Sequence, residues 1–163
     1  MSIYTEKTLK KLRDAGWQAQ VVEKWLHACK RRVDLFGIID IVAIREGQIL
    51  GVQSTSYNGR RDHLDEMLGE KRDAVLAWLK AGGKLTLVTW KKEKIKRGGV
   101  AFRYSPVVDI ITEAFVEKVV GCSREEMSLL LRSPLRRDRL NSTEALEAQF
   151  LIGSGLDELE VTQ

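Results

Sequence analysis

Two polar side chains interrupt otherwise apolar segments, and their types suit the binding of a divalent metal ion. Asp40 lies inside the apolar, β-branched run 38–44, and Gln53 follows thirteen residues later, near the end of a second apolar run, 48–55. An unpaired carboxylate buried in a strand is costly, so a cation, a basic neighbour or backbone donors must compensate it. Carboxylate and amide oxygens are ligands that Mg²⁺ accepts together with water. Asp40 and Gln53 are therefore candidate metal ligands.

The polar residues that follow Gln53 extend this candidate site. Ser54 and Thr55 offer hydroxyl groups, and Arg60 and Arg61 stand where a helix is predicted to begin. Backbone N–H groups and basic side chains at a helix N-terminus favour a bound anion such as phosphate. The segment therefore indicates a place where a metal ion and a phosphate could meet.

Each candidate also has a purely structural interpretation. Buried charges are usually paired, so a basic side chain could compensate Asp40 instead of a metal ion. The possible partners are Lys24, Arg31 and Arg32. Residues 53–56 could simply end a strand and cap the next helix. His63 and Asp65 are interpreted as a surface pair, because histidine is more often structural than catalytic.

Hydrophobic periodicity and turn residues predict the elements that hold these side chains. Residues 38–44 and 48–55 are expected to form two antiparallel strands joined by a short glycine-containing turn at 45–47. The other predicted elements are a helix over 4–15 with Thr5 as N-cap, a strand over 17–26, a helix over 60–83, a strand over 84–92, a basic turn over 93–99 and a strand over 100–108. This order predicts an α+β domain.

The C-terminal part of the chain has a different character. Residues 1–108 are expected to form the core, and residues 109–140 a helical extension with helices over 109–121 and 123–134. The last segment, 141–163, holds five acids and no lysine or arginine. We expect it to form a peripheral helix or to be partly disordered.

Charge is distributed unevenly along the chain. Residues 1–103 contain 21 lysines and arginines against 12 acids, whereas residues 104–163 contain 6 against 11. The basic part favours a polyanionic partner, nucleic acid before membrane, although an ordinary solvated surface would have similar charges. No apolar run is long enough to span a membrane, and the N-terminus lacks the apolar stretch of a signal peptide. A cytoplasmic location, in a bacterial or phage-infected host cell, is expected.

The order of elements and the motif residues resemble a known nuclease superfamily. An acid on a central strand, a hairpin, an acid-x-Lys motif on the next strand and a following helix make up the PD-(D/E)XK core of restriction endonucleases and Holliday-junction-resolving enzymes. The stretch "EKW…RRVDLFGIIDIVAI…ILGVQSTS" resembles small, mostly phage-encoded proteins assigned to that superfamily, whose second motif is Gln-x-Thr-Ser. The resemblance implies a restriction-endonuclease-like core: a helix, a three-stranded antiparallel meander, a helix and further strands.

The resemblance also implies roles for individual residues. Asp40 is the metal-binding acid, Gln53 replaces the second acid, and Thr55 occupies the position of the lysine that helps to activate water. The metal is Mg²⁺ or Mn²⁺. A further acid often completes the metal site. The candidates for it are Glu23 and Asp34, ranked equally, and Glu6.

These observations predict a metal-dependent DNA endonuclease that acts on duplex or branched DNA. The predicted DNA-binding residues are Arg31, Arg32, Arg60, Arg61 and Lys71. Such enzymes commonly act as homodimers, and Leu129, Leu130 and Leu131 could supply an interface. Two alternatives stay open: a DNA-binding protein on the same fold that has lost catalysis, and a phage protein that binds a host protein.

Overall fold

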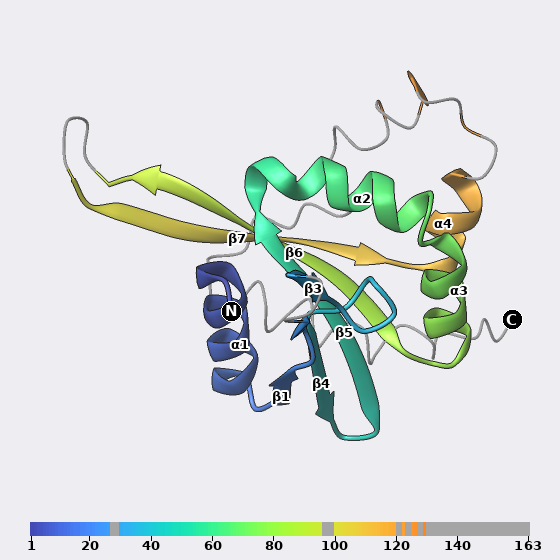
Figure 1. Ribbon diagram of the computed structural model, residues 1–163, viewed down its shortest axis with the longest axis horizontal. Coiled ribbons are helices and arrows are strands. Elements are labelled where there is room, and N and C mark those ends of the chain that lie inside the picture. The colour runs from blue at the N-terminus through green and yellow to red at the C-terminus, as the bar shows by residue number, and fades with distance from the viewer. Residues whose placement is uncertain (27–29, 96–99, 120–121, 123–124, 127–128, 130–163) are drawn as a thin grey trace, which may run out of the picture.

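A mixed five-stranded sheet forms the centre of the molecule, with helices on both of its faces (Figure 1). The computed structural model describes residues 1–26, 30–95, 100–119, 122, 125–126 and 129. The strands of the large sheet are β1 (Gln18–Val21), β4 (Ile41–Arg45), β5 (Gln48–Ser56), β6 (Lys84–Lys94) and β7 (Phe102–Ile111). A separate hairpin consists of β2 (Lys24–Leu26) and β3 (Arg31–Val33). The helices are α1 (Ile3–Asp14), the 3₁₀ helix η1 (Tyr57–Gly59), α2 (Arg60–Leu68), α3 (Arg72–Lys80) and α4 (Glu113–Val119). The predicted α+β class is confirmed.

The strand order of the large sheet is β1-β4-β5-β6-β7. Strands β1, β4 and β5 form an antiparallel meander, and β7 is antiparallel to β6. Strand β6 is parallel to β5. Parallel neighbours need a crossover connection, which η1, α2 and α3 supply. Only the three residues of η1 thus separate the end of β5 from the start of α2.

The predicted hairpin of β4 and β5 is confirmed. Ile41 pairs with Val52 and Arg45 with Gln48. The turn contains two residues, Glu46 and Gly47, with φ of 49° and 76°. Two successive positive φ values are typical of the tight turns that match the twist of antiparallel strands.

Each face of the large sheet has its own hydrophobic core. Helix α1 covers one face, where Leu9 and Leu12 pack with Leu50, Val52 and Val88. Helices α2, α3 and α4 cover the other face; the residues buried there include Leu64, Val75, Leu85, Leu87 and Val116. Side chains alternate between the faces along a strand, so Gln53, which follows Val52, belongs to the α2 side.

The predicted strand over 17–26 is wrong as a single element. The chain leaves the large sheet after Val21, where the backbone N–H groups of Val22 and Glu23 both donate to the carbonyl oxygen of Asp40, at 2.8 and 3.3 Å. Residues 24–26 then pair with β3 instead of with β4. Helix α1 is capped by the Ser2 side chain, which accepts from the backbone N–H of Thr5, and not by Thr5 itself.

The predicted single helix over 60–83 is broken into α2 and α3. The break falls at Gly69, whose backbone adopts φ −105° and ψ −97°. A Cβ atom at this position would lie 2.8 Å from the carbonyl oxygen of Asp65, so the bend requires glycine. Gly82 and Gly83 follow the end of α3, as the sequence predicted.

The C-terminal boundary also differs from the prediction. Strand β7 continues to Ile111, so residues 109–111 are strand and α4 begins only at Glu113. Leu129 is exposed, whereas Leu130, Leu131, most of the predicted helix over 123–134 and the tail 141–163 lie outside the described residues. In the part that the structure describes, no helix is both long and apolar enough to cross a membrane.

Candidate functional site

Asp40 and Gln53 lie side by side, just before the start of β4 and near the end of β5, as their spacing predicted. Asp40 directly precedes β4, and its backbone N–H donates to the carbonyl oxygen of Val52 at 3.0 Å. The Gln53 side chain donates from Nε2 to Asp40 Oδ1 at 3.3 Å, and the backbone N–H of Ser54 donates to Oδ2 at 2.9 Å. Both side chains are buried, with 5% exposure for Asp40 and 4% for Gln53. The hairpin register therefore fixes the orientation of the carboxylate.

The surroundings of Asp40 disfavour its charged form. Burial raises the pKa of the Asp40 carboxyl from its ordinary value of 3.8 to about 7, against the opposing effect of the hydrogen bond from Ser54. The negative charges of Asp34 and Glu23 contribute to this rise. Near neutral pH this carboxyl group thus exchanges a proton readily, and a bound cation would favour its ionised form.

The side-chain oxygen of Gln53, beside Asp40, has no hydrogen-bond partner among the described residues. Gln53 Oε1 is buried, and among the described residues it accepts no hydrogen bond. An unsatisfied buried oxygen costs about 1–3 kcal/mol, so such atoms in native structures call for an explanation. A ligand that supplies a positive charge or a donor would satisfy it.

A cavity of about 300 Å³ opens at these two residues. Its walls come from the N-terminus of α1, the base of the β2–β3 hairpin, the start of β4, the end of β5, and α2. The lining residues are Ser2, Tyr4, Thr5, Glu23, Asp34, Asp40, Gln53, Ser54, Thr55 and His63. Three carboxyl groups from separate chain segments therefore face one polar space.

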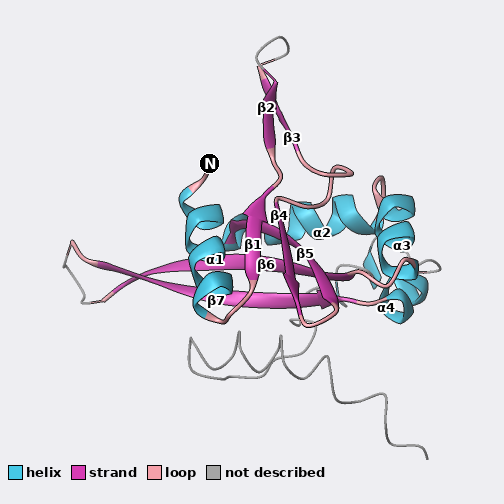
Figure 2. Cartoon of the chain, turned by 90° about the horizontal axis from the view of Figure 1, so that it is seen from below, coloured by secondary structure: helices cyan, strands magenta, loops and turns pink. Residues whose placement is uncertain are grey.

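The two further acids enter this space from the β2–β3 hairpin. Glu23 directly precedes β2 and Asp34 directly follows β3, so both ends of the hairpin meet at the cavity. Figure 2 shows the hairpin rising away from the large sheet. Both acids were predicted as candidates, and both line the cavity. Glu6, the third candidate, is an exposed residue in the first turn of α1 and is not part of the lining.

The predicted phosphate-binding arginine Arg60 is engaged elsewhere. Its guanidinium donates from Nε and from one terminal nitrogen to the two carboxylate oxygens of Asp109, each at 2.6 Å. These hydrogen bonds raise the pKa of Arg60, and Asp109 is fully buried in β7. The pair connects the start of α2 to β7. The Arg60 side chain therefore has a structural role that does not involve phosphate.

The remaining predicted basic residues lie outside the cavity. Arg61 is exposed, and its Nε lies 3.7 Å from Asp65 Oδ2. Lys71 pairs with Glu70 at 3.2 Å, and its stem packs against Gly37. Arg31 and Arg32 belong to β3, where they pair with Leu26 and Trp25 in the register, and their side chains are not described.

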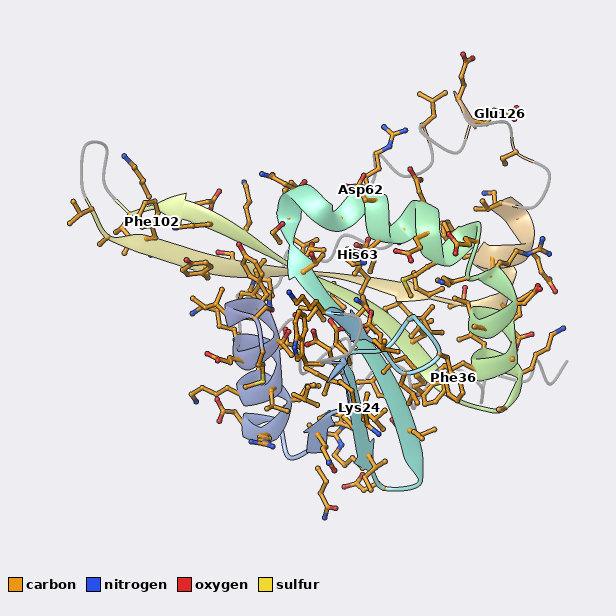
Figure 3. The ribbon with its side chains drawn as sticks, viewed as in Figure 1. Lys24, Phe36, Asp62, His63, Phe102 and Glu126 are labelled. Atoms are coloured by element: carbon orange, nitrogen blue, oxygen red, sulfur yellow. The ribbon has the colours of Figure 1, made fainter. Side chains whose placement is uncertain are left out.

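Thr55 and His63 form the wall of the cavity next to the end of β5. The 3₁₀ turn η1 brings them together, because a Cβ atom at Gly59 would lie 2.9 Å from Thr55 Oγ1 and 3.7 Å from His63 Cδ2. Of the described residues that line the cavity, only His63 can carry a positive charge. In Figure 3 His63 lies on the side of α2 that faces the sheet.

The interpretation of His63 as a surface pair with Asp65 is therefore wrong. Asp65 lies beside Arg61, whereas His63 is half-buried and lines the cavity. The sequence held a usable signal. His63 stands four residues before Met67, a buried residue, and residues four apart share one face of a helix.

Hydrogen bonds fix the end of β5 on its other side. Thr8 Oγ1 of α1 lies 2.8 Å from Ser54 Oγ, and it accepts from Trp90 Nε1 of β6, also at 2.8 Å. These three side chains are buried or nearly so. They hold α1, β5 and β6 in a fixed arrangement beside the cavity.

The oxygens present at this site fit a hard divalent ion. Among the described residues, no group of three or more histidine, cysteine, aspartate and glutamate side chains has the arrangement of a complete metal site. Mg²⁺, however, is usually held by one or two protein ligands together with water and substrate phosphate. Asp40 and the unpartnered Oε1 of Gln53 provide two such oxygens.

The described part of the chain is thus an α+β fold with a buried carboxylate in a polar, acid-lined cavity at the end of β5. No family model, curated protein or solved structure matches the sequence or the structure.

Proposed function

We propose that this protein is a metal-dependent DNA endonuclease with a restriction-endonuclease-like core. The observation that carries the proposal is the pair formed by Asp40 and Gln53, in which a carboxylate of raised pKa adjoins a buried oxygen without a partner. This pair lies in a cavity lined by two further acids, Glu23 and Asp34. Such a combination is costly in a protein interior unless a ligand uses it.

The arrangement of the elements supports the same class. Helix α1 is followed by the antiparallel strands β1, β4 and β5, then by crossover helices and by β6, parallel to β5. The PD-(D/E)XK resemblance implies this order, with the acidic motif at the hairpin of the second and third strands of the meander. The β2–β3 hairpin is an insertion between β1 and β4.

Asp40 and Gln53 are the residues that would hold Mg²⁺ or Mn²⁺, and Glu23 or Asp34 would complete the site. When bound, such an ion lowers the pKa of a bound water and stabilises the charge that develops on a phosphate. The chain itself orients the Asp40 carboxylate through the N–H of Ser54 and the amide of Gln53. In the metal-free protein the Asp40 carboxyl group itself carries a proton, and it would release that proton when a cation binds.

We assign to His63 the acid–base role that Thr55 cannot perform. A threonine hydroxyl does not exchange protons near neutral pH, whereas an imidazole group does. Arg60 is held by Asp109, and neither Arg61 nor Lys71 lines the cavity. His63 is the described basic side chain that borders the same space as Asp40.

The test is cleavage of linear, nicked, branched and single-stranded DNA by purified protein in Mg²⁺, Mn²⁺ or EDTA. Asp40→Asn keeps the size of the side chain and removes its charge, so it is expected to abolish metal-dependent cleavage while the far-UV circular dichroism spectrum stays unchanged. A fully active, folded Asp40→Asn protein would refute the proposal.

A second candidate is a DNA-binding protein that has kept this fold without catalysis. Thr55 at the position of the lysine favours it, as does the lack of lysine or arginine among the described lining residues. This alternative predicts salt-dependent DNA binding by the wild-type protein and no products with any metal ion.

A further inference from the structure

Strands β6 and β7 extend well beyond the rest of the large sheet. Strand β6 pairs with β5 as far as Trp90, which lies opposite Ser56, the last residue of β5. Beyond Trp90, β6 pairs with β7 alone, from Lys91 opposite Ser105 to Lys94 opposite Phe102. Figure 1 shows this two-stranded extension projecting from the body of the molecule. We call its described residues, 91–95 and 100–105, the arm.

One face of the arm combines lysines with aromatic rings. Strand alternation places Lys92 and Lys94 on the same face as their cross-strand partners Tyr104 and Phe102. The Nζ of Lys92 lies 4.1 Å from the centre of the Phe102 ring and 5.9 Å from that of Tyr104. Lys7 of α1 approaches the Tyr104 ring to 4.5 Å. These five residues, Lys7, Lys92, Lys94, Phe102 and Tyr104, form what we call the basic–aromatic face.

No described acid neutralises the positive charge of this face. On the opposite face, Lys91 lies 2.6 Å from Glu93, and that hydrogen bond raises the pKa of Lys91. Within the described residues, by contrast, no carboxylate pairs with Lys7, Lys92 or Lys94. An aromatic ring attracts a cation without cancelling its charge. The basic–aromatic face therefore presents a cationic surface to solvent.

The arm also exposes apolar side chains that no core requires. Ile95 is 53% exposed, Phe102 42% and Val100 94%. A two-stranded ribbon that projects into solvent is at best marginally stable by itself. Exposed apolar groups beside concentrated charge are typical of a surface that contacts a partner.

The base of the arm is connected to the candidate site. Trp90, where the arm begins, donates to Thr8, and Thr8 is hydrogen-bonded to Ser54 of the cavity lining. A polyanion that reaches the cavity at the end of β5 would therefore pass close to the start of the arm. This position favours nucleic acid over other anionic partners.

We propose that the basic–aromatic face of the arm binds the phosphate backbone of duplex DNA, with the two-stranded ribbon lying along a groove. The major groove of DNA accepts a two-stranded β-ribbon, and lysines that neutralise phosphates supply salt-dependent affinity. The inference rests on the proposed function for its choice of DNA, and it assigns substrate binding to a part of the chain that lies outside the cavity.

The experiment is equilibrium binding of a fluorescently labelled DNA duplex, followed by anisotropy in EDTA at about 50 and 200 mM salt. EDTA prevents metal-dependent cleavage, so the readout is binding alone. The test variant is Lys92→Ala/Lys94→Ala. Its matched control is Lys80→Ala/Lys118→Ala, which removes the same charge from exposed ends of α3 and α4, at the other end of the molecule.

The arm variant is expected to bind the duplex about tenfold more weakly than the control at the lower salt concentration. The slope of log K against log salt should become less steep by about 2, because two phosphate contacts are lost. Lys92→Arg/Lys94→Arg should restore both quantities. Rescue by arginine would show that a cation at these two positions, and not lysine in particular, supplies the affinity.

Equal duplex affinity of the arm variant and the control would overturn the inference. So would tight arm-dependent binding to vesicles of anionic phospholipid together with no arm dependence for DNA. The inference and the proposed function fail separately. If the wild-type protein cleaves no DNA, and DNA binding is lost in the arm variant, the proposed nuclease activity is refuted. DNA binding by the basic–aromatic face is then supported.

Discussion

At Asp40, burying a carboxylate beside two other acids is costly, and the proposed cation would reduce that cost. Its two oxygens accept from Gln53 and Ser54, and two further acids line the same cavity. Each acid makes ionisation of Asp40 less favourable, and each would be relieved by a cation in that space. The proposed cation would therefore offset the negative charge that Glu23, Asp34 and Asp40 concentrate in this cavity.

The role of His63 distinguishes the proposed nuclease from a DNA-binding protein without catalysis. If His63 transfers a proton to or from the reacting groups, His63→Ala should lower kcat on DNA by about a hundredfold. The KM for DNA should change little, because the proposed role of His63 concerns the reacting water and not the contacts with the rest of the DNA. Single-turnover cleavage kinetics would measure both, and added imidazole should restore part of the lost rate.

Asp62→Ala is the matched control for this prediction, since Asp62 is the preceding residue of α2 and is exposed. It should cleave at nearly the wild-type rate. A His63→Ala protein with unchanged kcat, or one whose lost rate does not respond to imidazole, would contradict an acid–base role for His63.

At the scale of elements, the junction of β5, η1 and α2 positions the cavity wall. Thr55 directly follows the buried part of β5, η1 turns the chain, and α2 presents His63. The ion pair of Arg60 with Asp109 anchors this junction to β7. The geometry of the site thus depends on a contact that lies outside the cavity.

Removal of Arg60 is expected to destabilise the protein strongly. Arg60→Ala leaves the Asp109 carboxylate fully buried without its cation, which typically costs about 3 kcal/mol or more of the free energy of unfolding. Urea denaturation followed by circular dichroism measures the loss. Replacing both partners by apolar residues, in Arg60→Met/Asp109→Leu, should recover much of the stability, because no uncompensated charge remains.

Arg61→Ala provides the comparison, because among the described residues Arg61 makes an exposed pair with Asp65 and no buried one. Its effect should be about 0.5 kcal/mol or less. If Arg60→Ala were as mild as Arg61→Ala, the Arg60–Asp109 pair would not be the anchor of this junction.

The sequence predicted the elements whose signals are local. Alternating apolar residues and a glycine turn were enough to predict the β4–β5 hairpin. The hairpin in turn predicted that Asp40 and Gln53 lie close together. The β2–β3 hairpin was missed because Trp17, Ala19, Val21 and Trp25 fall at alternate positions and suggested one strand. In the structure, the N–H groups of Val22 and Glu23 donate to the carbonyl oxygen of Asp40 where the chain leaves the large sheet, a long-range contact without a local signal. The break at Gly69 was missed because a lone glycine is often tolerated inside a helix.

The site was predictable only in part for a similar reason. Asp40 and Gln53 stand out because they interrupt apolar strands, whereas His63 occurs in a polar helix among other charged residues. The partner of Arg60 is 49 residues away in the sequence, on a strand that was expected to end at residue 108. Long-range ion pairs of this kind leave no periodic signal.

At the scale of the whole molecule, the cavity adjoins both hydrophobic cores. Ser54 lies on the α1 side of β5, whereas Gln53 and Thr55 lie on the side of α2. The ionisation of Asp40 is therefore linked to the stability of the entire fold, since the carboxyl group becomes fully solvated only when the chain unfolds. A titration of global stability can report on this one buried group.

The stability of the metal-free protein should fall as the pH rises from about 4 to about 8. The folded-state pKa of Asp40, about 7, lies above its ordinary value of 3.8, so the folded protein holds this proton more tightly than the unfolded chain. The resulting stabilisation is fully present below the unfolded-state pKa and is lost as the pH rises through the folded-state pKa; its upper limit is roughly 4 kcal/mol. Urea denaturation in EDTA at several pH values would measure it.

Asp40→Asn serves as the reference for this prediction, because it removes the titrating group and keeps the other ionisable residues. Its stability should vary less with pH than that of the wild type over this interval. At about pH 8, Mg²⁺ should raise the stability of the wild-type protein and not that of Asp40→Asn, since a cation replaces the proton only where the carboxylate is present. Parallel pH profiles of the two proteins would show that Asp40 is not the linked group. An equal response to Mg²⁺ would place the ion elsewhere.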